Sequence, residues 1–343
     1  MGSSMAAGRS TGTRSEKVLA TFPLHAAGVS TLADRVDLQI AGHEMLEEAE
    51  LGLFVPGLSA LIVGSTPVGA ATCERATNLK VIGRHGTGLD NIDLAAATRQ
   101  GIVVTYEPDA LTESVAEHTL ALMLALARSL RLADRLVRAG QWRDALPHLG
   151  TELAGKTLGL IGLGRTGTRV AEMARSALGM QVLAYDPFVR AREQDVNDVN
   201  LVRDLPELLP CVDVLSLHAP LTAGTYHLIG GEQLACMRRS AYVVNTSRGA
   251  LIAHEALVAA LQDGRLAGAA LDTFVEEPLP AADPLLSLDN VIVTPHIASH
   301  TEEAIARLAA GCAVQVLAVL EGRPPAHIAN PEVWHVRRGA PGL

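Results

Sequence analysis

The amino-acid sequence predicts an α/β protein built from two parallel sheets, each covered by helices on both faces. Short apolar runs alternate along the chain with segments whose apolar residues recur at helical spacing, a pattern typical of parallel sheets. One of these units also carries three closely spaced glycines and an acidic residue after the following strand. At 343 residues, with 48% hydrophobic and 19% charged residues, the chain is long enough for two domains with large cores.

The unit with the glycines spans residues 157–186. Its expected elements are a buried strand over Thr157–Ile161, a helix over Thr168–Leu178 that ends at Gly179, and a strand over Gln181–Tyr185. Gly162, Gly164 and Gly167 follow the first strand in G-x-G-x-x-G spacing, and Asp186 follows the second strand. A glycine turn without a ligand would explain neither this spacing nor the acid, so we predict a dinucleotide-binding Rossmann unit.

Each residue type in this unit suits one part of a dinucleotide. Gly162 makes the tight turn, Gly164 lets a pyrophosphate approach the backbone, and Gly167 lets the helix pack against the strand. The helix N-terminus offers N–H groups and the positive end of its dipole to the phosphates. Asp186 would accept hydrogen bonds from the ribose hydroxyls and repel a 2′-phosphate, so NAD is the expected cofactor rather than NADP.

The residues before this unit imply a second sheet without the glycine fingerprint. Strands are expected over Lys17–Phe22, Ala60–Val63, Lys80–Ile82 and Ile102–Thr105, with a helix over Asp93–Gln100. Ser114, with Glu117 three residues later, resembles a capping box. The helix that it would begin is expected to run to about Leu136.

Four further apolar runs follow the glycine unit, and each ends in polar residues. Strands are expected over Val212–Leu217, Ala241–Asn245, Gly268–Leu271 and Val291–Thr294, followed by a helix over Glu302–Glu321. Arg248, Glu277 and His296 follow the last three strands. Singly, they read as a solvated loop arginine, a turn residue and a structural histidine. Together they gather beyond the carboxyl ends of strands, where ligands bind in open α/β sheets.

Composition and charge argue against several classes of function. The net charge of −9 and the sequence pI of about 5.7 disfavour nucleic acid or an anionic membrane as a partner. The four cysteines have no metal-ligand spacing, so we expect no metal site and a reducing compartment, hence a cytoplasmic protein. No segment is expected to span a membrane, since the most apolar stretch, Thr119–Ala127, is too short. Residues 1–15 are expected to form a disordered tail.

From about residue 17 to residue 325 the sequence resembles the D-isomer-specific 2-hydroxyacid dehydrogenases, which include hydroxypyruvate/glyoxylate reductases and phosphoglycerate dehydrogenases. The matching motifs, in order, are I-G-R-H-G-T-G-L-D-N-I-D, S-V-A-E-H-T-L-A-L-M-L-A-L-A-R, G-L-G-R-T-G, L-H-A-P-L-T, N-T-S-R-G, A-L-D-T-F-V-E-E-P-L-P and T-P-H-I-A-S. The catalytic arginine, glutamate and histidine of the family fall on Arg248, Glu277 and His296. The resemblance therefore implies an active NAD-dependent oxidoreductase.

The resemblance also implies roles for individual residues. His296 would donate a proton to the carbonyl oxygen of a 2-oxo acid, Glu277 would orient the imidazole ring, and Arg248 would bind the substrate carboxylate through its two-pronged guanidinium. Thr87 and Gly88 match a second carboxylate-binding position, close to Arg84. Besides the glycines, Asp186 and His296, the positions that match cofactor contacts are Thr112, Arg165, Thr166, His218, Pro220, Thr225, Thr246, Asp272 and Ser299.

The architecture that the resemblance implies has two Rossmann- or flavodoxin-like domains with a cleft between them. The substrate-binding domain would be discontinuous, made of residues 16–117 and 299–343, and the NAD-binding domain would span residues 118–298. A homodimer through the NAD-binding domain is expected. The helix from Ser114 and the arm Leu136–Leu149 occupy the matching region.

The substrate is expected to be a small 2-oxo acid or the corresponding 2-hydroxy acid. Some phosphoglycerate-type relatives have an arginine after the strand that here ends at Val63, where this chain has G-S-T-P. The missing cation disfavours binding of a buried phosphate. Arg84 and His85 lie close to the predicted substrate loop and could replace that charge in part. Hydroxypyruvate, glyoxylate and small aliphatic 2-oxo acids therefore remain open, beside 3-phosphoglycerate.

Two other readings of the family resemblance remain. Some relatives act as NAD-sensing transcriptional corepressors that keep the same three residues. Others oxidise formate or phosphite, but the formate-oxidising relatives carry glutamine where Glu277 stands.

Overall fold

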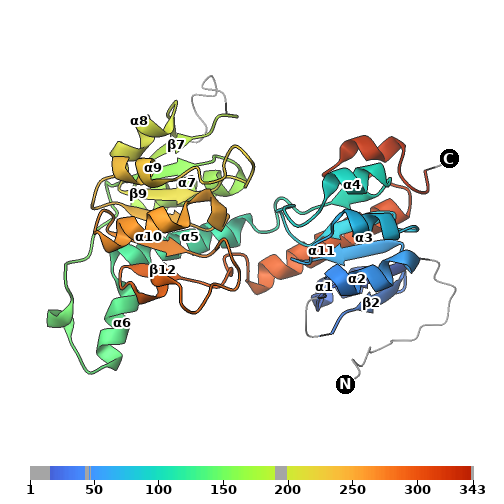
Figure 1. Ribbon diagram of the computed structural model, residues 1–343, viewed down its shortest axis with the longest axis horizontal. Helices are drawn as coiled ribbons and strands as arrows, with labels where there is room; N and C mark the ends of the chain where they lie inside the picture. Colours follow the sequence, from blue (N-terminus) through green and yellow to red (C-terminus); the bar gives the residue numbers. More distant parts are fainter. Residues whose placement is uncertain (1–15, 43–45, 47, 190–198, 341–343) are drawn as a thin grey trace. The chain divides into compact units, whose positions relative to one another are not determined.

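The computed structural model describes residues 16–42, 46, 48–189 and 199–340, so the predicted tail over residues 1–15 lies outside it. The chain forms two compact units (Figure 1). The N-terminal unit contains the chain up to Leu111 and, in addition, Thr301 and the residues after it. The central unit is Thr112–His300. Each unit contains one parallel sheet, which confirms the predicted fold class.

The sheet of the N-terminal unit has the strand order β2-β1-β3-β4-β5, which is the order of flavodoxin-like folds. The strands are β1 (Lys17–Ala20), β2 (Asp37–Ile40), β3 (Ala60–Val63), β4 (Val81–Arg84) and β5 (Val103–Thr105). The helices are α1 (Ala26–Leu32), α2 (Glu48–Phe54), α3 (Ala70–Arg75), α4 (Leu94–Arg99) and α11 (Glu302–Leu320).

Both faces of this sheet are buried, because successive strand residues enter two different cores. One core joins residues such as Val18 and Ile62 to Leu32 of α1 and Val316 of α11. The other joins alternate strand residues to α2, α3 and α4. Helix α11, which comes last in the chain, is therefore an integral part of the N-terminal unit.

The sheet of the central unit has the strand order β12-β11-β10-β9-β6-β7-β8. Its strands are β6 (Thr157–Ile161), β7 (Gln181–Tyr185), β8 (Asn200–Leu201), β9 (Val214–Leu217), β10 (Tyr242–Asn245), β11 (Gly268–Leu271) and β12 (Val291–Val293). The order reverses at β6, as in a Rossmann fold, and ligands bind beyond the carboxyl ends of strands at such a switch point.

Helices cover both faces of the central sheet as well. Helices α5 (Thr112–Ala127) and α7 (Arg165–Leu178) pack on one face. Helices α8 (Leu205–Leu208), α9 (Gly231–Cys236) and α10 (His254–Gln262) pack on the other face. Strands β6, β9, β10 and β11 are accordingly buried almost throughout, as expected of a parallel sheet that is covered on both sides.

The predicted long helix from Ser114 to Leu136 is wrong in two respects. Helix α5 already begins at Thr112, so Ser114 is a buried residue of its first turn and does not cap it. The helix ends at Ala127, and Ser129 has a φ of 48°, in the left-handed region, before α6 (Leu130–Arg138) begins. Arg131 accounts for the new direction, because it donates hydrogen bonds to the carbonyl oxygens of Leu288 and Val291, at 3.1 and 3.0 Å.

Among the described helices, α11 alone has the length and apolar character that a membrane span requires. Just over half of it, 56%, is buried within the protein, and it packs on the sheet of the N-terminal unit. Its apolar surface is therefore explained by its place in a protein core. The segment singled out from the sequence as most apolar, Thr119–Ala127, belongs to the core helix α5.

Candidate active site

The glycine turn between β6 and α7 combines close packing with one open position. Gly162 has a φ of 92°, and a Cβ there would lie 2.7 Å from the carbonyl oxygen of His218. A Cβ on Gly167 would lie 2.2 Å from the carbonyl oxygen of Gly162. Gly164 differs, since no described atom lies within 4 Å of a Cβ at that position. Two glycines are therefore required by packing, and the third leaves room beside the N-terminus of α7.

Asp186, directly after β7, lies against this turn. Its Oδ2 accepts a hydrogen bond from the backbone N–H of Leu163 at 2.8 Å, and its Oδ1 accepts one from Phe188 at 2.9 Å. Carboxylate oxygens accept more than one hydrogen bond each, so acceptor capacity remains for a ligand.

His218, directly after β9, borders the other side of the turn. Its Nε2 forms a hydrogen bond with the hydroxyl of Ser216 at 2.9 Å, and its buried Nδ1 has no hydrogen-bond partner among the described residues. Burial lowers the pKa of His218 to about 4, so the ring is neutral at neutral pH. The unpartnered nitrogen, the open position at Gly164 and the carboxylate of Asp186 together fit a dinucleotide.

The remaining predicted cofactor positions also lie in the central unit. Arg165 and Thr166 are in the first turn of α7, and Thr112 begins α5. Thr225 donates a hydrogen bond from its hydroxyl to the carbonyl oxygen of Pro220 at 2.6 Å. Ser299 follows β12, and Thr246, after β10, shares a hydrogen bond of 3.0 Å with the hydroxyl of Thr119 on α5.

His296 and Glu277 are brought together by the ends of two neighbouring strands, β12 and β11. Their side chains form a hydrogen bond of 2.8 Å between Nδ1 and Oε2. The other carboxylate oxygen of Glu277 accepts a hydrogen bond from the backbone N–H of Phe274 at 2.9 Å, which fixes its orientation. The side chain of His296 is 48% exposed, so the ring is held at one nitrogen and is accessible to a small molecule.

Arg248 follows β10, the next strand of the sheet, in a loop held by hydrogen bonds. The side chain of Asn245 donates to the carbonyl oxygen of Arg248 at 2.8 Å and accepts from the backbone N–H of Ser247 at 3.0 Å. A Cβ on Gly249 would lie 2.1 Å from the carbonyl carbon of Phe274, so only glycine allows this close approach of the two strand ends. Arg248, Glu277 and His296 thus lie at one edge of the sheet.

Asp272, at the end of β11, has a fully buried side chain. Its carboxylate accepts hydrogen bonds from the hydroxyl of Thr294 at 2.6 Å and from the backbone N–H groups of Ile297 and Ala298 at 2.9 and 2.8 Å. Burial alone would raise the pKa of Asp272, but these donors and His118 hold it below its usual value. Asp272 is therefore an anion at the base of the turn that carries His296.

The predicted substrate loop of the N-terminal unit follows β4. Arg84 donates hydrogen bonds from its guanidinium to the carbonyl oxygens of Gly88, at 2.8 Å, and His85. The hydroxyl of Thr87 donates to the carbonyl oxygen of Glu107 at 2.9 Å. Arg84 thus contacts the backbone of the loop that it begins.

Sequence reasoning did not assign a function to His118, Thr119 or Thr294. These residues join α5 to the ends of β10 and β12 through side-chain hydrogen bonds. The available signal was that His118 and Thr119 are polar residues directly before the apolar run Leu120–Ala127 of α5.

The central sheet has the Rossmann strand order, and its glycine turn has room for a dinucleotide. A histidine–carboxylate pair lies beyond the carboxyl ends of its strands. These features are those of a nicotinamide-dinucleotide-dependent oxidoreductase. Residues 120–298 match the family model described as D-isomer specific 2-hydroxyacid dehydrogenase, NAD binding domain. The chain belongs to the D-isomer specific 2-hydroxyacid dehydrogenase family.

Individual relatives agree with this assignment. The chain is 45% identical over 273 residues to the glyoxylate reductase of Thermofilum pendens, covering 79% of this chain and 80% of that protein. It is 44% identical over 315 residues to the D-3-phosphoglycerate dehydrogenase of Methanocaldococcus jannaschii, covering 92% of this chain but 59% of that protein. The crystal structure of the TT0316 protein of Thermus thermophilus superimposes with a TM-score of 0.84 at 40% identity, covering 91% of this chain and 99% of that one.

Proposed function

We propose that this protein is an NAD-dependent reductase of small 2-oxo acids, which it converts to D-2-hydroxy acids. The observation that carries the proposal is the hydrogen bond of 2.8 Å between His296 and Glu277 at the ligand edge of the central sheet. A proton donor is needed there, because negative charge develops on the carbonyl oxygen during reduction.

The three residues have separate tasks in this proposal. Glu277 holds Nδ1 of His296 and so presents the other ring nitrogen, carrying a proton, to the carbonyl oxygen. Arg248 binds the carboxylate of the 2-oxo acid through two parallel hydrogen bonds, which fixes the carbonyl group next to His296. The nicotinamide ring, when bound, supplies the hydride. In the reverse direction His296 accepts the proton of the hydroxyl group.

The cofactor that we propose is NAD rather than NADP. The support is Asp186, whose carboxylate lies on the glycine turn and takes part in hydrogen bonds to Leu163 and Phe188. An anion at this position accepts hydrogen bonds from ribose hydroxyls and repels a 2′-phosphate.

Glyoxylate and hydroxypyruvate are the substrates that we favour. The loop 64–67 contains no cationic residue, and it is tied to the loop after β4, because the side-chain amide of Asn91 donates to the carbonyl oxygens of Gly64 and Thr66 at 3.0 and 2.8 Å. Arg84, at the end of the neighbouring strand β4, donates to backbone carbonyl oxygens. A small uncharged substituent on the 2-oxo acid fits these surroundings better than a phosphate.

Oxidation of 3-phosphoglycerate is the second candidate, because the chain is 44% identical to a D-3-phosphoglycerate dehydrogenase. The deciding experiment follows nicotinamide absorbance with glyoxylate, hydroxypyruvate, pyruvate and 2-oxobutyrate in the presence of NADH, and with 3-phosphoglycerate in the presence of NAD. We expect the highest kcat/KM with glyoxylate or hydroxypyruvate. Turnover of 3-phosphoglycerate alone would favour the second candidate, and no turnover at all would contradict the proposed enzyme.

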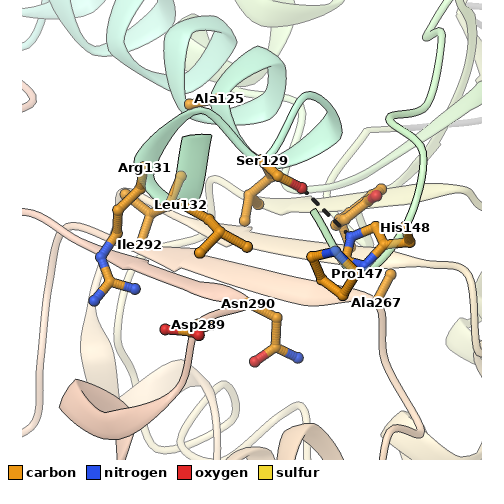
Figure 2. Close-up of a pocket in the computed structure, with 12 residues that line it drawn as sticks. Ala125, Ser129, Arg131, Leu132, Pro147, His148, Ala267, Asp289, Asn290 and Ile292 are labelled. Atoms are coloured by element: carbon orange, nitrogen blue, oxygen red, sulfur yellow. Dashed lines mark hydrogen bonds between the residues drawn. The ribbon is translucent and has the colours of Figure 1, made fainter. Parts of the chain in front are cut away.

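We also propose that the protein is a homodimer through the central unit. The segment 130–149 exposes large apolar side chains, with Trp142 68% and Leu149 94% exposed. Beside it lies a cavity of about 210 Å³, lined by Leu126, Leu132, Tyr242 and Ile292 (Figure 2). In Figure 2, Arg131 and Asp289 lie at one end of this cavity and Pro147 and His148 at the other. A second copy of the same segment would cover this surface.

Light scattering on the protein as it elutes from a size-exclusion column measures its molar mass and so tests whether it is a dimer. Trp142→Asp is expected to shift the dimer toward monomer, because a carboxylate would be buried in the interface. Leu53→Asp is the matched control, since Leu53 is 78% exposed but lies in the N-terminal unit. A monomeric unmodified protein, or a dimer that resists Trp142→Asp, would count against this interface.

A further inference from the structure

The backbone turn that carries His296 is folded around a buried carboxylate. His296 has a φ of 54°, in the left-handed region that residues with a Cβ rarely adopt. Thr294 on one side of it, and Ile297 and Ala298 on the other, all donate hydrogen bonds to the side chain of Asp272. The backbone N–H of His296 donates to the carbonyl oxygen of Asp272 at 2.8 Å. Asp272 therefore holds both sides of the turn while the imidazole ring projects from it.

His118 extends this network to helix α5. Its Nε2 lies 3.2 Å from the hydroxyl oxygen of Thr294 and 3.6 Å from Oδ1 of Asp272. Because the hydroxyl of Thr294 donates to Asp272, its oxygen is left to accept from Nε2–H of His118. The side chain of His118 is 20% exposed, so this contact is mostly shielded from water.

Thr119, the next residue of α5, contacts the neighbouring catalytic loop. Its hydroxyl shares a hydrogen bond of 3.0 Å with the hydroxyl of Thr246, and both side chains are buried. Thr246 lies two residues before Arg248 in the loop after β10. One dipeptide of α5 thus contacts the loops of both His296 and Arg248.

We propose that His118 and Thr119 are positioning residues for the proposed reaction. Through its hydrogen bond to Thr294, His118 holds the turn of His296 in position. Through its hydrogen bond to Thr246, Thr119 holds the loop of Arg248 in position. This inference rests on the proposed function, in which His296 is the proton donor and Arg248 binds the substrate carboxylate. In this proposal, neither residue binds the substrate or transfers a proton. Loss of either one is expected to misplace a catalytic group rather than to remove it.

The two contacts should have separable effects on kinetics. Thr294→Val and His118→Phe each break the path to His296, so both should lower kcat by roughly 10- to 100-fold through misplacement of the proton donor. Thr119→Val should mainly raise KM for the 2-oxo acid, because it loosens the loop of the carboxylate ligand. A general loss of structure would instead lower the melting temperature and change both constants in every variant.

Conservative variants provide the matched controls. Thr294→Ser restores the hydroxyl and His118→Gln restores an N–H donor, so each should recover most of the lost kcat. Thr31→Val removes a threonine hydroxyl from α1 in the N-terminal unit, where it donates to the carbonyl oxygen of Ala27 at 2.8 Å, and should change neither constant. If Thr294→Val does not fold, the pair His118→Phe and His118→Gln decides the question.

A measurement on the cofactor-free protein separates this inference from the proposed function. The proton shared by Nδ1 of His296 and Glu277 should give a downfield NMR signal that is absent in His296→Ala. Thr294→Val and His118→Phe should broaden or shift that signal, whereas Thr119→Val should leave it in place. An unchanged signal and unchanged kcat in the first two variants would overturn the inference. If the unmodified protein reduces no 2-oxo acid, the proposed function fails, but the NMR signal still tests the positioning.

Discussion

At the scale of single residues, His296 and Arg248 lie at the same edge of the central sheet, but their replacement should change the kinetics in different ways. His296→Ala removes the proposed proton donor, so kcat should fall by roughly 10²–10⁴-fold while the Kd for NADH changes little. Arg248→Ala should raise KM as well as lower kcat, and Arg248→Lys should recover only part of the loss because lysine lacks a planar pair of donors. Steady-state kinetics at saturating NADH, with NADH binding measured by fluorescence, checks these expectations.

His300→Ala is the control for this comparison. His300 is an exposed histidine four residues after His296 and has no proposed catalytic task. It should behave like the unmodified protein. The proposed mechanism is wrong if His296→Ala keeps near-normal kcat under conditions in which the chemical step limits the rate.

A second prediction for a single residue concerns Asp186 and the choice between NADH and NADPH. The unmodified enzyme should prefer NADH to NADPH by at least roughly tenfold in kcat/KM, which corresponds to about 1.4 kcal/mol. Asp186→Asn keeps the size and a hydrogen-bond acceptor for Leu163 but removes the charge, so it should reduce this preference. Competition between the two cofactors in one assay measures the ratio. Equal use of both by the unmodified enzyme would show that Asp186 does not select the cofactor.

At the scale of elements, the sequence predicts well those helices, strands and turns whose formation depends on residues close together in the chain. The unit β6–α7–β7 is confirmed with its strand bounds, and Gly179 ends α7 with a φ of 62°. Strand β2, Asp37–Ile40, was not predicted, because it is an edge strand whose residues are all half-buried and form no continuous apolar run. The break at Ser129 was missed because it depends on hydrogen bonds from Arg131 to residues about 160 positions away.

The same distinction holds for the candidate site. The glycine turn is a local motif, so spacing alone predicts it. The alignment of Arg248, Glu277 and His296 at one sheet edge follows from their positions after consecutive parallel strands. The contact between His118 and Thr294 joins residues 176 positions apart, and although His118 is a polar residue before an apolar run, no local pattern identifies its partner. Such side-chain contacts follow from packing of a helix on a sheet, which the sequence does not specify residue by residue.

The glycine turn allows a matched test of the element itself. Gly164→Ala adds a methyl group in open space at a φ of −77°, so the stability of the cofactor-free protein should change by less than about 0.5 kcal/mol. The same methyl group should weaken NADH binding, because it occupies the approach to the backbone. Gly167→Ala should instead destabilise the cofactor-free protein by about 1–3 kcal/mol, since its Cβ would collide with Gly162.

Thermal unfolding without cofactor and fluorescence titration with NADH measure the two effects separately. The assignment of the turn would be contradicted if Gly164→Ala binds NADH normally. A destabilisation by Gly164→Ala as large as that by Gly167→Ala would contradict the packing argument.

At the scale of the whole molecule, each unit contains a half-buried histidine, with one shielded ring nitrogen, that should make folding sensitive to acid. His85 lies in the N-terminal unit, where its ring packs against Phe22 with centroids 4.8 Å apart, and His218 lies in the central unit. Burial lowers the pKa of each to about 4, and the charge of Arg84 contributes at His85. An ordinary histidine in an unfolded chain has a pKa of about 6.5.

These shifts fix the sign of the pH dependence. Between pH 6.5 and pH 4 the unfolded chain binds protons at both histidines, while the folded protein does not. The free energy of unfolding is therefore fully retained above pH 6.5 and falls as the pH drops toward 4, by up to about 3 kcal/mol for each histidine. His85→Asn and His218→Asn should each make this fall shallower, because asparagine does not titrate.

Urea unfolding at several pH values measures the slope in each unit. In a Trp142→Phe background, Trp334 is the sole tryptophan and reports on the N-terminal unit, so its transition should lose acid sensitivity in His85→Asn. Circular dichroism follows the whole chain and should show the corresponding change in His218→Asn. If both variants keep the full slope between pH 6.5 and pH 4, the two histidines are not buried in their neutral form. The acid sensitivity would then come from carboxyl groups, and it would extend to a lower pH.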